Sequence, residues 1–289
     1  MTSPRRIVDC SIGQAEESMD LHFVDDVVRP TTRDELPSPL PGDALLAGGT
    51  SVMAEPGRDL RRLVDLTTLD WPDLTVADDG LEIAATCTID RLVHADLPEN
   101  WHARTLFRWC ADSLVASYKI WHTATVGGNV CLALPAGSMT SLCSVLDASL
   151  LVWHPDGTDS VVSVADVVVG NQRNSLAPGD LLRSIHVPTA ALTAPVAARR
   201  VSYAEYGRAG AVVLGRATDG GVVISVSGGT VRPFAIPVPS REPDEVVAAC
   251  AAVVPEAAWF TDAHGTAEWR RAVVPHLVRE VVTELGSAA

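Results

Sequence analysis

Short apolar runs that end at turn residues dominate the pattern of hydrophobic and polar positions along the chain. Residues 44–47 stop at Gly48-Gly49, which predicts a buried strand that leads into a tight turn. Residues 63–66 predict a second short strand. An Asp-Gly pair between two apolar runs is typical of a β-hairpin. Such pairs stand at residues 79–80, 156–157 and 219–220.

Apolar residues recur at helical spacing in residues 102–117, 140–148, 245–253 and 267–285. Pro275 interrupts the last of these patterns, so we expect a kink or two short helices there. Strands and helices mix without a regular βαβ alternation, which predicts an α+β fold rather than a doubly wound sheet. The small, loop-like residues 189–198 predict a domain boundary near residues 188–195.

Composition limits the classes of function. The chain has 289 residues and a formal net charge of −14, which disfavours a protein that binds nucleic acid through its phosphates. With 47% hydrophobic residues, the chain can bury a packed core. No apolar run approaches the roughly 18 residues of a membrane span. The N-terminus is polar and lacks the apolar region of a secretory signal, so residues 1–18 are expected to form a flexible extension.

The cysteines and several known motifs exclude further kinds of site. The six cysteines show no Cys-x-x-Cys spacing, so neither a thiolate zinc site nor an iron–sulfur cluster is expected, and no metal ligand is assigned. We interpret them as reduced thiols of a cytoplasmic protein. The sequence also lacks the Rossmann fingerprint, the P-loop, and the nucleophile and zinc motifs of common hydrolases.

Two segments with paired glycines are the strongest candidates for chemistry. They are Ala47-Gly48-Gly49-Thr50-Ser51, directly after a predicted strand, and Thr125-Val126-Gly127-Gly128-Asn129. Paired glycines let a ligand approach the backbone closely, and successive exposed N–H groups can form a concave site for phosphate oxygens. Two such loops converging on one cleft would suit the diphosphate of a dinucleotide. The alternative is that each segment is only a turn.

No residue is assigned a role in acid, base or nucleophilic catalysis. His122 lies next to the second glycine segment and could approach a ligand, although an ordinary loop histidine is the more common situation. Cys131 and Cys143 have no basic sequence neighbour that would lower a thiol pKa, so we interpret both as core thiols.

At these residues the sequence resembles a known family, the FAD-binding medium subunits of molybdenum hydroxylases of the xanthine dehydrogenase and aerobic carbon monoxide dehydrogenase type. Residues 47–51 are similar to the family's A-G-G-T-[DS] loop, and residues 125–129 to its T-x-G-G-N loop. Further segments similar to family motifs, in register, are residues 132–136, 176–182, 185–188, 227–230 and 265–271. The resemblance extends over about residues 21–285.

The resemblance implies a particular architecture. An FAD-binding domain of the vanillyl-alcohol-oxidase or PCMH type, in two α+β subdomains, would occupy residues 19–190. A smaller α+β domain like the C-terminal domain of carbon monoxide dehydrogenase flavoproteins would occupy residues 195–287. FAD would lie between the two subdomains, with its diphosphate on the two glycine loops.

The resemblance also implies which residues contact FAD. Ala47, Gly48, Gly49, Thr50, Ser51 and Val52 would surround the diphosphate from one side, and Thr125, Gly127, Gly128 and Asn129 from the other. Leu182 or Arg183 would touch the flavin ring. Ser138 stands where the family often has an acidic residue that reaches the adenosine half. The chain also departs from the family at residues 120–122, and at Glu205, where the family has a cation.

The function implied by the resemblance is electron transfer within a larger enzyme. Electrons would come from a molybdenum–pterin cofactor on a large subunit, through [2Fe–2S] clusters on a small subunit, to FAD on this chain. FAD would then reduce an acceptor such as NAD or a quinone, and the assembly would be a dimer of heterotrimers. Two alternatives stay open: a self-sufficient flavin-dependent oxidoreductase, and a scaffold subunit that has lost FAD.

Overall fold

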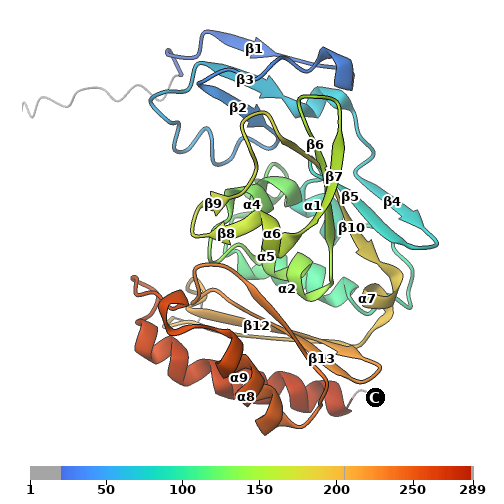
Figure 1. Ribbon diagram of the computed structural model, residues 1–289, viewed down its shortest axis with the longest axis vertical. Coiled ribbons are helices and arrows are strands. Elements are labelled where there is room, and N and C mark those ends of the chain that lie inside the picture. Colours follow the sequence, from blue (N-terminus) through green and yellow to red (C-terminus); the bar gives the residue numbers. More distant parts are fainter. Residues whose placement is uncertain (1–20, 205, 288–289) are drawn as a thin grey trace, which may run out of the picture.

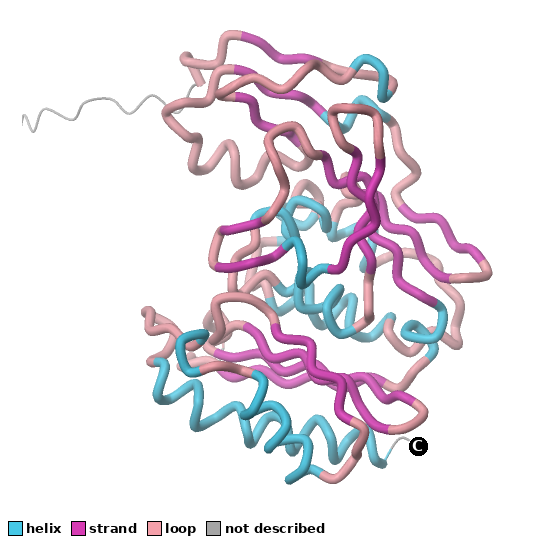
Figure 2. The backbone as a smooth tube through the Cα atoms, in the orientation of Figure 1, coloured by secondary structure: helices cyan, strands magenta, loops and turns pink. Residues whose placement is uncertain are grey.

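The three larger of the four β-sheets in the described residues follow one another along the long axis of the molecule, with helices packed between the second and the third (Figure 1). The computed structural model describes residues 21–204 and 206–287. The predicted N-terminal extension, residues 1–18, lies outside the described residues. The mixture of antiparallel sheets and separate helices confirms the predicted α+β class (Figure 2).

The first sheet is small and parallel. It contains β1 (Asp26–Val28), β2 (Asp43–Leu46) and β3 (Arg62–Asp65) in the order β1-β3-β2. The strands predicted at residues 44–47 and 63–66 are therefore confirmed, each shifted by one residue. Because β2 ends at Leu46, the chain turns where the first glycine segment begins.

The second sheet has the order β4-β5-β10-β6-β7 and is antiparallel throughout. Its strands are β4 (Leu74–Ala77), β5 (Gly80–Ala84), β6 (Ser149–Trp153), β7 (Asp159–Ser163) and β10 (Leu181–Pro188). The hairpins β4–β5 and β6–β7 confirm two of the Asp-Gly predictions.

Short helices connect and cover this second sheet. They are α1 (Ile89–Val93), α2 (Arg104–Ser113), α3 (Tyr118–Trp121), α4 (Val126–Leu132), α5 (Ser138–Val145), α6 (Val164–Val167) and α7 (Thr189–Thr193). A small pair of strands, β8 (Val168–Gly170) and β9 (Arg173–Asn174), stands beside them. The helices predicted at residues 102–117 and 140–148 correspond to α2 and α5, both shorter than expected.

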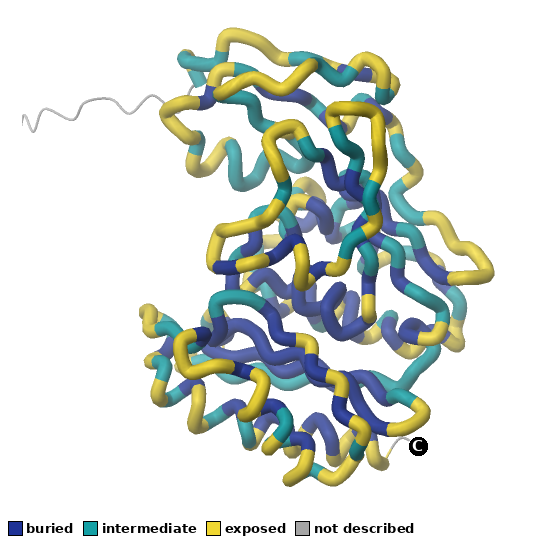
Figure 3. Tube along the Cα trace, in the orientation of Figure 1, coloured by how far each residue is buried: buried dark blue, intermediate teal, exposed yellow. Residues whose placement is uncertain are grey.

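The third sheet lies between two layers of helices. It contains β11 (Val196–Val201), β12 (Ala211–Thr218), β13 (Gly221–Ser227) and β14 (Phe234–Val238) in sequence order, and β12–β13 confirms the third Asp-Gly hairpin. The helices α8 (Pro243–Val253) and α9 (Ala267–Ser287) cover one face, while α2 and α5 lie against the other (Figure 1). Every residue of β13 is consequently buried (Figure 3).

Polar contacts fix the third sheet to the preceding helices. The Ser141 hydroxyl donates to the Ser227 hydroxyl oxygen at 2.7 Å, in a buried position between α5 and β13. Arg216 Nε donates to the carbonyl of Val145 at 2.8 Å. Because buried polar groups are costly without partners, these bonds favour one relative position of the two layers.

Two predictions for the C-terminal part are wrong in detail. Helix α9 runs without interruption through Pro275, so of the two expected outcomes, a kink or two short helices, the second is wrong. Its buried positions, including Val274, Val278 and Val281, pack on the sheet, and this burial offsets the hydrogen bond that proline cannot donate. Residues 189–198 are not loop-like, because they contain α7 and the start of β11.

The five cysteines within the described part of the chain are free thiols. Burial raises the pKa of Cys131 and of Cys143 to about 12, so neither is a thiolate at neutral pH. This result supports their interpretation as core thiols. No helix among residues 21–204 and 206–287 is both long and apolar enough to span a membrane.

The fully buried guanidinium of Arg270 gives a test of the C-terminal packing. It donates to the carbonyls of Gly210 at 2.8 Å and Phe260 at 2.5 Å, and to Asp262 Oδ1 at 2.7 Å. The Arg270→Met variant should lose about 3–5 kcal/mol of unfolding free energy, since those acceptors are left without a donor. The matched variant Arg271→Met removes an exposed ion pair with Glu256 and should cost less than about 1 kcal/mol. Urea unfolding followed by circular dichroism measures both, and equal losses would contradict the account.

Candidate functional site

The two glycine segments, far apart in the sequence, meet at the end of β2. A Cβ atom added to Gly48 would stand 1.8 Å from the carbonyl oxygen of Thr123. Only glycine allows such an approach, so the first segment lies directly against the residues that precede the second. The structure thus brings together the two segments in which the sequence predicted a diphosphate site.

The first segment presents free backbone donors. In the described part of the chain, the N–H groups of residues 48–52 donate to no acceptor. Gly49 has a φ of +70°, the left-handed conformation that lets successive N–H groups curve around an anion. Residues 47–52, which include all six predicted contacts Ala47, Gly48, Gly49, Thr50, Ser51 and Val52, are half-buried and uncharged.

The second segment forms the start of helix α4, and the N–H groups of its residues 126–129 donate to acceptors within the protein. The N–H of Val126 donates to Cys87 and that of Gly127 to Ala85, at 2.9 and 3.2 Å. Thr125 caps the helix, because its hydroxyl oxygen accepts from Gly128 N at 3.0 Å. The expectation of exposed N–H groups is therefore wrong for residues 126–129 of this segment. Its glycines serve close packing instead, since a Cβ on Gly127 would lie 2.5 Å from that of Ala85.

Asn129 connects the second segment to a pocket between the second and third sheets. Its Oδ1 accepts from Met139 N at 3.2 Å, which turns the side chain toward the chain segment after α4. The pocket has a volume of about 230 Å³ and is lined on one side by Asn129 and residues 134–137. The opposite wall comes from the C-terminal part, with Arg208, Asp262 and His264.

The polar residues of that opposite wall were missed in the sequence. Asp262 is anchored, because its Oδ1 accepts from the guanidinium of Arg270 and from the backbone N–H of His264, both at 2.7 Å. Arg208 and His264 line the same pocket. The only available signal was their proximity to the segment 265–271, which resembles a family motif.

Ser138 lies apart from the open donors. It is buried at the start of α5, and its hydroxyl donates to the carbonyl of Cys110 at 2.5 Å. The side chain therefore faces the interior, and its predicted contact with adenosine has no support in this geometry.

Leu182 and Arg183 stand at an irregularity in the β10–β6 pairing of the second sheet. Leu182 is buried in the main core. The Arg183 guanidinium lies over the ring of Trp71 at 4.3 Å and faces Trp153 at 5.7 Å. Burial lowers the pKa of Arg183, although nearby Glu82 opposes this effect. Leu182 could make the predicted contact with a flavin ring only through its backbone, because its side chain is buried. The Arg183 side chain already packs against the two tryptophans.

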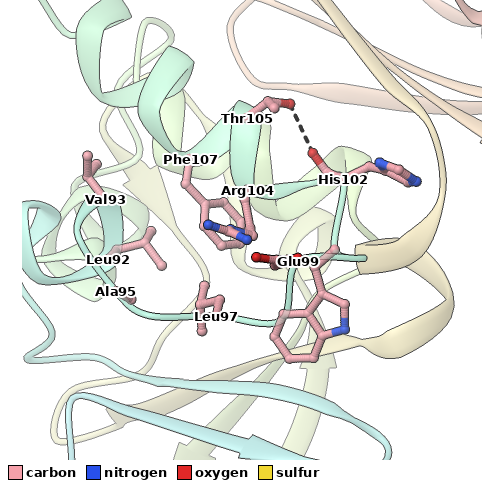
Figure 4. A pocket seen from close by; sticks show the side chains of 10 residues that line it. Leu92, Val93, Ala95, Leu97, Glu99, His102, Arg104, Thr105 and Phe107 are labelled. Carbon is pink, nitrogen blue, oxygen red and sulfur yellow. Dashed lines mark hydrogen bonds between the residues drawn. The ribbon is translucent and has the colours of Figure 1, made fainter.

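The pocket in Figure 4 lies elsewhere, between α1 and α2, and has a volume of about 340 Å³. Leu92, Leu97 and Phe107 form its apolar side, and Glu99 and Arg104 lie at its polar side. It contains none of the predicted site residues. Among residues 21–204 and 206–287, no group of three or more His, Cys, Asp or Glu side chains could hold a metal ion.

A comparison with family models identifies one family. The sequence profile of a family described as "FAD binding domain in molybdopterin dehydrogenase" matches residues 24–190. No curated protein matches the chain.

Solved structures extend the likeness to nearly the whole chain. The chain is similar to one of carbon monoxide dehydrogenase from Oligotropha carboxidovorans, with a TM-score of 0.78, 22% identity, and coverage of 92% of this chain and 98% of that chain. It is also similar to a chain of quinoline 2-oxidoreductase from Pseudomonas putida 86, with a TM-score of 0.73, 17% identity, and coverage of 92% and 98%. At these identities the likeness shows a shared fold.

The close approach at Gly48 gives a direct test of how the two segments meet. In Gly48→Ala the new methyl group collides with the Thr123 carbonyl, so we expect a loss of about 1–3 kcal/mol of unfolding free energy. Gly57→Ala is the matched control, since no atom lies within 4 Å of the added Cβ, and it should stay within about 0.5 kcal/mol of the parent. Urea unfolding compares the two, and an undisturbed Gly48→Ala protein would show that the segments do not touch in solution.

Proposed function

Since the chain belongs to the family of FAD-binding domains of molybdopterin dehydrogenases, we propose that it binds FAD through its two glycine segments. The observation that supports this most strongly is the run of free N–H groups at residues 48–52, held against Thr123. Backbone donors around a left-handed glycine suit the oxygens of a diphosphate. The segment has no side-chain charge, so the backbone carries the recognition.

The second segment contributes shape and one side chain rather than N–H donors. Gly128 is exposed and leaves the surface of the first turn of α4 without a side chain, whereas Gly127 is buried against the core. The Asn129 amide nitrogen can donate to the ligand, because its oxygen is already used by Met139 N. The diphosphate is therefore contacted mainly by the first segment and accommodated by the second.

We place the flavin ring system toward the pocket that Asn129 shares with the C-terminal part. A ring there would contact residues 134–137 on one side and Arg208 and His264 on the other. FAD, when bound, supplies the redox chemistry that side chains lack. The role of this chain's residues is to hold the cofactor, shield it from water and set the charge around it. This placement makes the predicted domains, residues 19–190 and 195–287, partners in one site.

Electron transfer within a multi-subunit enzyme follows as the proposed role. We propose that the iron–sulfur clusters and the molybdenum–pterin cofactor belong to a small and a large partner subunit, in keeping with the described cysteines, which are all free thiols. Similarity in fold to carbon monoxide dehydrogenase and quinoline 2-oxidoreductase chains supports this arrangement. We further propose a cytoplasmic dimer of heterotrimers that reduces NAD or a quinone.

One observation favours a second candidate, a self-sufficient flavin-dependent oxidoreductase. Such an enzyme needs an acid or base near the flavin, and His264 lines the proposed ring pocket. Turnover of an organic substrate by the purified chain without partners, abolished in His264→Asn, would support this candidate. Tagged chain that co-purifies with molybdenum and iron–sulfur subunits supports the electron-transfer role. A colourless chain that takes up no FAD even with its partners would leave the scaffold alternative.

Asn129 and Ser138 make a discriminating pair for the FAD site. Asn129→Ala should weaken FAD binding by about tenfold, because one donor to the ligand and one anchor for residues 137–139 are removed. Ser138→Ala should change FAD affinity by less than about twofold but cost about 1 kcal/mol of stability, because its hydroxyl serves Cys110. Quenching of flavin fluorescence gives the affinities. A large loss of affinity in Ser138→Ala would restore the predicted adenosine contact.

A further inference from the structure

His122 stands immediately before the point where the two glycine segments meet. It ends α3, and its Nδ1 lies 3.2 Å from Asp90 Oδ2 on α1. Its ring also packs edge-on against Tyr118, with 4.3 Å between ring centroids. The next residue, Thr123, provides the carbonyl oxygen that Gly48 approaches. The carboxylate of Asp90 thus holds the imidazole of His122, and the next residue, Thr123, makes the contact with Gly48.

Helix α1 and the residues after His122 are joined by the backbone as well. The N–H of Ile89 donates to the carbonyl of Ala124 at 2.9 Å, and Thr88 pairs with Thr125 across an isolated β-bridge. Asp90 lies next to Ile89, so the Asp90–His122 pair adds a side-chain link at the end of this backbone pairing. A loss of attraction in the pair would loosen the segment from residue 122 to Thr125 rather than the core behind it.

Two histidines, His94 and His122, lie close to the carboxylate of Asp90, but only His122 comes from another element. His94 lies one turn further along the same helix, with Nδ1 at 3.1 Å from Asp90 Oδ1 and 3.0 Å from the Asp90 carbonyl oxygen. His94 therefore cannot link α1 to another element, whereas His122 does. Asp90 is mostly buried, with 17% of its side chain exposed, and His122 is 46% exposed, so solvent protons reach the imidazole freely.

We propose that Asp90 and His122 form a pH-sensitive positioning pair that tightens FAD binding when His122 is protonated. The idea rests on the proposed function. A protonated imidazole makes an ion pair with Asp90, which holds Thr123 against Gly48, and its charge also favours a nearby diphosphate. The neutral imidazole keeps at most a hydrogen bond. Imidazoles lose their proton near neutral pH, so affinity for FAD falls as pH rises through that range.

The surroundings of His122 leave few other groups that could produce such a change. Asp90 and His94 of α1 and Tyr118 of α3 are the titratable groups in contact with the pair. Arg91 of α1 pairs with Asp73 instead, at 3.6 Å. The first glycine segment contributes no charged side chain. The contributions of His122 and His94 can be separated by substitution.

The test is a titration of the full-length protein with FAD between pH 5.5 and 8.5, followed by flavin fluorescence. We expect the dissociation constant to rise by about two- to fivefold over this range, the size expected of a partly exposed ion pair. In His122→Gln the weaker binding of high pH should persist at every pH, and Asp90→Asn should flatten the profile as well. His94→Gln is the matched control and should keep the parent profile.

Hydrogen exchange gives a second readout that does not depend on FAD. The amides of Thr123 to Val126 should exchange faster at high pH than the intrinsic pH effect predicts, in the parent but not in His122→Gln. If His122→Gln keeps the pH dependence of the parent, or if the parent itself shows none, the proposed role of the positioning pair is wrong, although FAD binding stays supported. A protein that binds no FAD at any pH overturns the proposed function itself, and with it this inference.

Discussion

The contact between Gly48 and Thr123 is the constraint on which the site depends. Each side belongs to a different sheet system: Gly48 follows β2 of the small parallel sheet, and Thr123 precedes α4 above the large antiparallel one. A side chain at position 48 would separate these systems. Beside this contact, the N–H groups of residues 48–52 have no acceptor in the described part of the chain. The absence of a side chain at Gly48 therefore allows the close packing of the backbone beside which the unpaired N–H groups lie.

The large core keeps the second half of the site in place. The third sheet is covered on both faces, so its central strands β12 and β13 are buried along nearly their whole length rather than at alternate positions. Burial of these strands, together with the Ser141–Ser227 and Arg216 contacts, fixes the C-terminal part against α2 and α5. Arg208 and His264 consequently face Asn129 across one pocket, although about 80 residues or more separate them in the sequence.

The elements with strong local signals were predictable, and the contacts between them were not. The Asp-Gly hairpins and the strand before Gly48 follow from turn chemistry and short apolar runs. The alternative of two short helices at Pro275 is wrong, because tertiary burial outweighs one missing hydrogen bond and α9 continues through that residue. Paired glycines indicated a site, but only the structure separates the open donors of the first segment from the internally bonded ones of the second. Ser138 points inward for the same reason: side-chain direction at a helix start depends on packing that a sequence does not reveal.

In the proposed function, backbone donors of the first segment recognise the diphosphate of FAD. The most direct test of this recognition is calorimetric titration of the purified chain with FAD and, separately, with FMN, which has the same ring but lacks the diphosphate bridge and adenosine. The account predicts about one FAD bound per chain and an affinity for FMN at least about a hundredfold weaker, because several charge-assisted hydrogen bonds are lost. Equal affinities for the two flavins would contradict it.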